Sequence, residues 1–190
     1  MYGILAEDIE TLKVLIRRLA DDQKIPIRGK GFDGCGKLLK EGWKYLKSLP
    51  DLNCSRFVIA HDADQSDFKQ VEQMLRDKII KPSGVKVSIC LLVPVQEIEA
   101  WVLADVEAVS NVIKVWKNGS KPKAIVNPES ILNPKEHLEK LCRDLHGHPR
   151  YIHTIHNRQL AIHIDLAKVY KNCPSFRPLE EFVKSGKSNY

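Results

Sequence analysis

The feature that most constrains the fold is an alternation of apolar runs and amphipathic segments that repeats four times before about residue 117. Segments of strand length occupy residues 2–7, 24–32, 55–64 and 85–95; the second is a short stretch that ends in glycines, and the others are mainly apolar. Each precedes a segment in which apolar residues recur every three or four positions, as on one face of a helix, at residues 9–23, 36–49, 66–80 and 97–113. Four consecutive strand-helix units predict an α/β fold, with a mostly parallel sheet covered by helices on both faces.

The pattern changes after residue 117. Residues 117–130 are polar and rich in turn formers, and helical patterns then follow at residues 134–145, 159–173 and 174–185. We therefore predict an α/β domain over residues 1–117 and a helical C-terminal extension, residues 118–190, packed on it. A chain of 190 residues with 43% hydrophobic residues is long enough to bury such a core.

Composition narrows the class of protein without identifying it. No apolar run approaches the ~20 residues that a membrane-spanning helix needs, and the first residues lack the basic start of a signal peptide. We expect a soluble, cytoplasmic protein. The five cysteines are scattered without a CxxC pair, which indicates free thiols. A formal net charge of +6 is compatible with a polyanionic partner but does not require one.

Acidic residues gather where the predicted strands end. Glu7 follows the first run, Asp62 and Asp64 follow the third, and Glu97 and Glu99 follow the fourth. In parallel α/β sheets, ligands bind at the carboxyl ends of the strands, which open onto one rim of the sheet. The sequence therefore predicts that acids distant along the chain converge at one site.

The acids that follow the third run have two interpretations. Mg²⁺ and Mn²⁺ prefer carboxylate oxygens, so Asp62 and Asp64 are candidate metal ligands at a turn after the strand. A turn followed by a helix, with Ser66 or Asp67 as the N-cap, explains the same acids without a metal. The DxD pattern alone does not separate the two interpretations.

The acids after the first and fourth segments have the same two interpretations, as metal ligands or as residues of a first helical turn. Glu7 ends an apolar strand and would share the rim with Asp62, which makes it the best single candidate for a ligand. Glu10 falls in the first turn of a helix, where the helix dipole favours an acid. Glu97 and Glu99 could support a second metal ion or could equally belong to a first helical turn.

Gly29, Gly31 and Gly34 form a GxGxxG spacing. The spacing follows the second strand and has no ribose-binding acid after it, so a tight strand-to-helix turn explains it better than a dinucleotide site. Lys30 and Lys37 in the same stretch could reach a phosphate at the rim.

Four histidines cluster late in the chain, at His146, His148, His153 and His156. Their spacing fits no usual zinc pattern, so we interpret them as part of a basic surface outside the metal site. Trp101 shares a helical face with apolar residues, and we expect it in the core.

These stretches resemble a known family. A glutamate that ends a first strand and a DxD that ends a later one, in α/β order, are similar to the Toprim domain of topoisomerases, primases and OLD-family nucleases. More narrowly, the chain resembles the stand-alone Toprim-like proteins of the DUF4276 family, through the segment around Glu7, VQEIEAWVLAD at residues 95–105 and LAIHIDLAKVYKNCPSF at residues 160–176. It departs from the family at Asp8, where members carry glycine, and at Thr11, where they carry an acid.

The resemblance implies a Toprim-like, Rossmann-like fold and a metal-dependent nuclease that hydrolyses phosphodiester bonds in DNA or RNA with Mg²⁺ or Mn²⁺. The metal ions would be held by Glu7, Asp62 and Asp64, and the catalytic set would also include Glu97 and Glu99. Cations must offset this negative charge toward a nucleic acid. The candidates for nucleic-acid binding are Lys30, Lys37, Arg150 and Arg158.

Relatives of this family often stand beside ATPases in prokaryotic anti-phage defence, so the resemblance also implies an AAA- or ABC-type ATPase partner. The chain has no Walker motif of its own. Another class stays open, a degenerate Toprim module that binds nucleic acid or a partner protein without cleaving, which the altered residues after Glu7 favour. A HAD-type phosphatase is disfavoured, because Glu7 and Ile9 do not supply its aspartate pair. The sequence does not reveal the oligomeric state.

Overall fold

The computed structural model describes residues 1–114, 116, 122–186 and 188–189. Over these residues the chain forms a sheet of four parallel strands in the order β2-β1-β3-β4. The strands are β1 (Tyr2–Ala6), β2 (Ile27–Gly31), β3 (Arg56–Ala60) and β4 (Ser88–Leu92). Each strand lies within one of the four predicted strand segments, and the predicted α/β fold is confirmed.

The helices first alternate with the strands and then follow one another. In chain order they are α1 (Ile9–Leu19), α2 (Cys35–Ser48), α3 (Phe68–Leu75), α4 (Lys81–Ser83), α5 (Glu99–Leu103), α6 (Val106–Ile113), α7 (Pro134–Leu141), α8 (His153–His163), α9 (Leu166–Asn172) and α10 (Arg177–Ser185). A π-helical turn, η2 (Arg76–Ile80), joins α3 to α4. Short 3-10 turns lie at Pro50–Leu52, Pro128–Ser130 and Pro174–Phe176.

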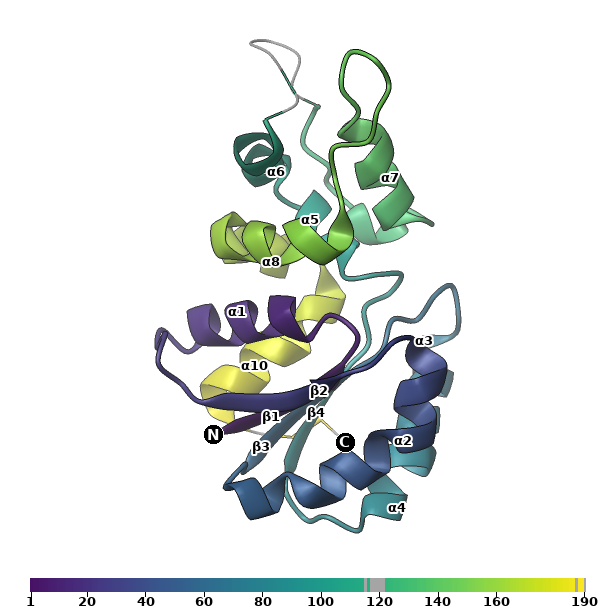
Figure 1. Cartoon of the computed structure of the whole chain (residues 1–190), viewed down its shortest axis with the longest axis vertical. Helices are drawn as coiled ribbons and strands as arrows, with labels where there is room; N and C mark the ends of the chain where they lie inside the picture. Colours follow the sequence, from purple (N-terminus) through teal and green to yellow (C-terminus); the bar gives the residue numbers. More distant parts are fainter. Residues whose placement is uncertain (115, 117–121, 187, 190) are drawn as a thin grey trace.

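Helices cover both faces of the sheet (Figure 1). Residues of α1 and α10 pack in one buried cluster on one face, and residues of α2 and α3 pack in a second cluster on the other. All five residues of β1 are buried, because its side chains alternate between the two layers, with Ile4 in the first and Leu5 in the second. Each such buried side chain contributes about 1.5–3 kcal/mol of hydrophobic stabilisation.

Two segments predicted as single helices are each broken in two. Residues 97–113 form α5 and α6, and the helical pattern at residues 159–173 is split between α8 and α9. The breaks meet in space, because the buried carboxylate of Asp105 accepts hydrogen bonds from the backbone N–H of Asp165 at 2.9 Å and from Lys168 Nζ at 2.8 Å. Local periodicity contains no information about this contact between distant residues.

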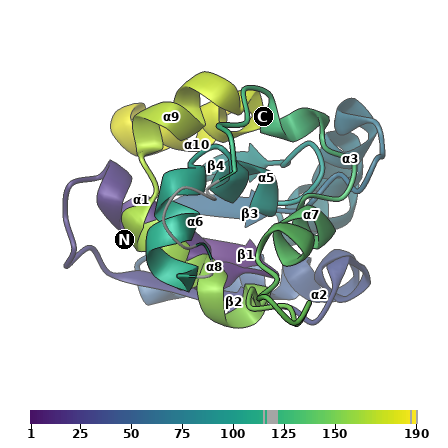
Figure 2. The same cartoon turned by 90° about the horizontal axis from the view of Figure 1, so that it is seen from above.

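The C-terminal helices share a core with the sheet. Tyr151, Leu160 and Phe176 belong to the same buried cluster as Ile4 and Val58. Two perpendicular views place α5, α7 and α8 over the end of the sheet (Figures 1 and 2). The predicted boundary between residues 117 and 118 lies outside the described residues. The C-terminal half of the chain is therefore positioned to wall a site at this end of the sheet.

The structure also bears on the predictions for Trp101, the glycine-rich turn, the cysteines and membrane-spanning helices. Trp101 is a core residue, as expected, and its ring packs edge-on against Phe176 with 5.2 Å between the centroids. Gly34 precedes α2 with φ +98°, a conformation that favours glycine, which agrees with the predicted tight turn. All five cysteines are free. Within the described ranges, no helix has both the length and the apolar character to cross a bilayer.

Candidate functional site

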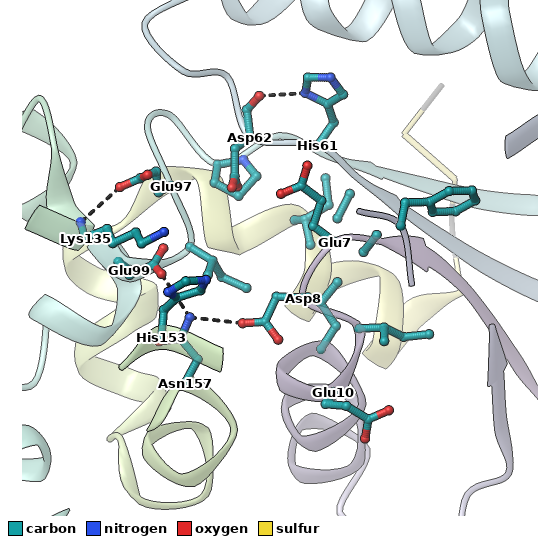
Figure 3. Close-up of a pocket in the computed structure, with 18 of the residues that line it drawn as sticks. Glu7, Asp8, Glu10, His61, Asp62, Glu97, Glu99, Lys135, His153 and Asn157 are labelled. Carbon is teal, nitrogen blue, oxygen red and sulfur yellow. Dashed lines mark hydrogen bonds between the residues drawn. The ribbon is translucent and has the colours of Figure 1, made fainter. Parts of the chain in front are cut away.

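A cavity of about 470 Å³ lies at the carboxyl ends of β1, β3 and β4, with the beginnings of α7 and α8 on its other side (Figure 3). Seven of the described residues that line it carry carboxylates: Glu7, Asp8, Glu10, Asp33, Asp62, Glu97 and Glu99. The whole chain has a formal net charge of +6. The cavity is therefore a concentration of negative charge on a basic protein, and it contains four of the five predicted site acids.

Glu7 and Asp8 follow β1 and have different partners. Asp8 is the N-cap of α1, because its Oδ1 accepts a hydrogen bond from the backbone N–H of Thr11 at 3.1 Å. Glu7 is exposed and reaches the start of α2, where the Cys35 thiol donates a hydrogen bond to its carboxylate. Burial raises the pKa of this thiol, and the negative charge of Glu7 raises it further.

The two aspartates of the DxD motif are placed differently. After β3, the backbone N–H groups of residues 61, 63 and 64 still donate to the carbonyls of residues 92, 94 and 96, and the chain then turns. Asp62 is half-buried and lines the cavity. Asp64 is exposed, has a left-handed φ of +46° and lies outside the lining. The turn interpretation therefore describes Asp64, and Asp67 is the N-cap of α3 as predicted.

Asp62 is strongly affected by its surroundings. Burial raises its pKa well above the usual value, and the carboxylates of Glu99, Asp64, Glu7 and Glu97 raise it further. Each of them favours the protonated form, because a second negative charge nearby is unfavourable. The other four predicted acids thus all act on Asp62, although Asp64 stands at the exposed edge of this group.

Glu97 is tied to the start of α7. Its Oε2 accepts a hydrogen bond from the backbone N–H of Lys135 at 2.9 Å. The residue before the helix, Asn133, provides no side-chain cap, so Glu97 satisfies an N–H group that would otherwise lack a partner at this helix end. The contact holds the loop after β4 against the C-terminal half of the chain.

Asn157 of α8 joins two carboxylates from different parts of the chain. Its Nδ2 donates to Asp8 Oδ2 and to Glu99 Oε1, both at 3.0 Å. Its Oδ1 accepts a hydrogen bond from the hydroxyl of Tyr151, which also lies 3.2 Å from Glu99 Oε1. Asn157, Tyr151 and Glu99 are 2%, 1% and 4% exposed. Burial raises the pKa of Glu99, and the hydrogen bond from Asn157 partly offsets this shift.

Sequence reasoning missed three residues of the site, Asn157, Tyr151 and Lys135. One signal was available, since Asn157 shares the buried face of its helix with Leu160 and Ala161. A buried polar side chain on an apolar face needs a hydrogen-bonding partner. Tyr151 and Lys135 gave no such signal, because their contacts with Glu99 and Glu97 depend only on the way the C-terminal helices pack over the sheet.

The four cations predicted to bind nucleic acid do not line the cavity. Lys37 and Arg150 are ion-paired with neighbouring aspartates, at 3.1 and 3.4 Å. Lys30 lies over an aromatic ring, 5.7 Å from its centroid, and Arg158 is exposed on α8. The lysine that lines the cavity is Lys135.

In the part of the chain that the structure describes, no three His, Cys, Asp or Glu side chains stand close enough together to hold a metal ion. His153, predicted to lie on a surface outside the site, lines the cavity together with His61. The His61 ring is buried, and its Nε2 has no hydrogen-bonding partner among the described residues. His146 and His148 lie outside the lining.

Comparison with known proteins gives one match. The family model described as a domain of unknown function, DUF4276, matches residues 8–184, which begins one residue after Glu7 and includes the other four predicted site acids. No curated protein and no solved structure matches the chain. The family match spans nearly the whole chain, including β2, β3, β4, α8 and the loop that carries Glu97, and it begins after β1. The chain therefore belongs to the DUF4276 family.

Proposed function

We propose that the cavity holds one or two Mg²⁺ or Mn²⁺ ions and that the protein is a nuclease that hydrolyses phosphodiester bonds in DNA or RNA. One observation carries the proposal: Glu7, Asp62, Glu97 and Glu99, which follow three neighbouring parallel strands, line the same cavity. These side chains offer oxygen donors, the type that both ions prefer.

The charge of the cavity fits a divalent cation. Burial raises the pKa of Asp62 most, and other carboxylates raise it further; a divalent cation would relieve the repulsion between these like charges. We assign Glu7 and Asp62 as ligands, with Asp64 as the third acid of the set at the exposed edge of the cluster. A bound ion would polarise the scissile phosphate and lower the pKa of an attacking water.

Hydrogen bonds within the protein hold the remaining carboxylates in place. Asn157 and Tyr151 contact the Glu99 carboxylate, and the backbone N–H of Lys135 contacts that of Glu97. Groups fixed in this way need little reorganisation when charge develops on a substrate. In this proposal, Glu97 and Glu99 shape the field around the reacting phosphate while Glu7 and Asp62 bind the ion.

The finer parts of the proposal depend on the Toprim resemblance. They are a Toprim-type site, an AAA- or ABC-type ATPase partner, a role in prokaryotic anti-phage defence and a location in the cytoplasm. The residues that support them are Glu7 and the DxD pair at Asp62 and Asp64. Because the chain lacks a Walker motif, ATP hydrolysis in such a system would be the task of the partner.

A non-catalytic binding module is the second candidate, and one observation favours it. Asp8, Glu97 and Glu99 all accept hydrogen bonds from other parts of the chain, which gives each a structural role without a metal. A degenerate Toprim fold of this kind would bind nucleic acid or a partner protein and leave it intact.

Cleavage of end-labelled DNA and RNA, single- and double-stranded, with Mg²⁺ or Mn²⁺ tests the nuclease proposal. Changes to residues around metal ligands typically cost 10–100-fold, so Glu7→Gln and Asp62→Asn, which change the ligands, should lower the rate by about 100-fold or more. The matched control is Glu181→Gln, at an exposed glutamate of α10. Equal rates in all four proteins would refute the site, and intact substrates would favour the binding module.

A further inference from the structure

One wall of the cavity differs in chemistry from the rest. Lys135, in the first turn of α7, and His153, the first residue of α8, both line the cavity. Their side chains approach it from the side opposite Glu7 (Figure 3). Thr154 adds a hydroxyl beside them. We infer that these three residues, the donor wall, bind a phosphate group of the substrate on the side opposite Glu7.

This inference rests on the proposed function, because it specifies where the substrate of the same site is held. A phosphate placed between a metal ion and the donor wall would meet positive charge on both sides. The donor wall is separate from the four cations that the sequence indicated, which lie outside the cavity lining. It is therefore a prediction about different residues, with a test of its own.

Lys135 has its charge available for an anion. Its backbone N–H is bonded to Glu97, but its Nζ forms no ion pair with the described residues, although it points into a cavity lined by carboxylates. Lys140 of the same helix pairs with Glu136 one turn away, at 3.8 Å. An ammonium group and a phosphate attract strongly in a partly enclosed site, where water screens them less.

His153 and Thr154 extend the donor wall at the start of α8. His153 is half-buried and Thr154 is exposed, and both line the cavity. The N-cap residue Ile152 provides no side-chain cap to the first turn of α8, and the positive dipole of this helix end adds to the charge of Lys135. An imidazole N–H and a hydroxyl are both hydrogen-bond donors that a phosphate oxygen can accept from.

The size of the cavity indicates how much of the substrate it receives. At about 470 Å³ it lies in the range of small-molecule sites, roughly 300–1,000 Å³, and can enclose a single nucleotide. The ligand class is therefore a nucleotide phosphate, whether at a chain end or in a free mononucleotide. Because carboxylates line the same cavity and would repel a phosphate, we expect binding to strengthen when a divalent cation is present.

Calorimetric titration of thymidine 5′-monophosphate, with and without Mn²⁺, tests the donor wall. Lys135→Met should weaken nucleotide binding by about 10–100-fold, the loss expected for one charge-assisted contact. The same change should leave Mn²⁺ affinity equal or higher, because it removes a positive charge beside the carboxylates. His153→Asn should weaken nucleotide binding by about tenfold. Lys140→Met, on the same helix but ion-paired on its exposed face, is the matched control.

The two proposals fail in different ways. Normal Mn²⁺ binding with equal nucleotide affinity in Lys135→Met and Lys140→Met would overturn the donor wall and leave the metal site standing. If no metal bound but the nucleotide did, and Lys135→Met abolished that binding, the donor wall would survive the loss of the proposed function. If neither ligand bound to the wild-type protein, both proposals would be wrong. Retained Mn²⁺ affinity in Lys135→Met also shows that the variant is folded.

Discussion

Asn157 is predicted to stabilise the site, and the variant Asn157→Ala measures by how much its hydrogen bonds raise the free energy of unfolding. The substitution removes two hydrogen bonds that Nδ2 donates to Asp8 and Glu99. Hydrogen bonds to charged groups contribute about 1.5–3 kcal/mol each, so the free energy of unfolding should fall by about 3–6 kcal/mol at pH 7. The Tyr151 hydroxyl keeps Glu99 as an acceptor and adds little to this loss.

Urea unfolding followed by circular dichroism gives this value directly. With a slope of about 1–3 kcal/mol per molar urea, the midpoint should fall by at least about 1 M. Asn111→Ala, at an exposed position of α6, is the matched control and should stay within about 0.5 kcal/mol of wild type. The effect of Asn157→Ala should shrink at low pH, where Glu99 is protonated. Equal midpoints for the two variants at pH 7 would refute the stabilising role of the hydrogen bonds that Asn157 makes.

Two further predictions concern charge in the cavity. The folded pKa of Asp62 is raised above its usual 3.8, so the stability that this group contributes is greatest below that pH and is lost as the pH rises through the folded value. Asp62→Asn should therefore melt at a higher temperature than wild type at pH 8, with a gap that narrows toward pH 4; an equal or lower melting temperature at pH 8 would contradict this. The Cys35 thiol should react slowly with iodoacetamide at pH 8 and faster in Glu7→Gln, which lacks one cause of its raised pKa, and mass spectrometry measures both rates.

Hydrophobic periodicity predicted much of the fold, because the pattern that marks a strand or a helix lies within a few neighbouring residues. β1, β3 and β4 each have at least four consecutive buried residues, and α1 and α2 have one apolar stripe each. The edge strand β2 has no buried residue and was indicated by its place between two helical patterns. The helix breaks at Asp105 and Asp165 were missed because their cause is a hydrogen bond between residues far apart in sequence. The same limit applies to any helix that ends for a tertiary reason.

In the candidate site, too, some residues could be predicted from the sequence and others could not. Glu7 and Asp62 could be placed at one rim, because parallel strands bring their carboxyl ends together wherever they occur in the chain. Asn157, Tyr151 and Lys135 could not, because no rule of strand order says how helices that follow the sheet will fold back over its end. The structure adds Asn157 and Lys135 to the lining of the cavity, and it adds Tyr151 behind them as a hydrogen-bonding partner of Asn157.

The central claim is that Glu7 and Asp62 bind a divalent cation, and calorimetric titration of Mn²⁺ into the wild-type protein, Glu7→Gln, Asp62→Asn and Glu181→Gln tests it most directly. The account predicts saturable binding of one or two ions to the wild-type protein and to Glu181→Gln. It predicts that each of the two site variants loses at least one of these ions or weakens its binding by about 10–100-fold or more. Absence of binding to the wild-type protein, or equal affinity in all four proteins, would contradict the claim.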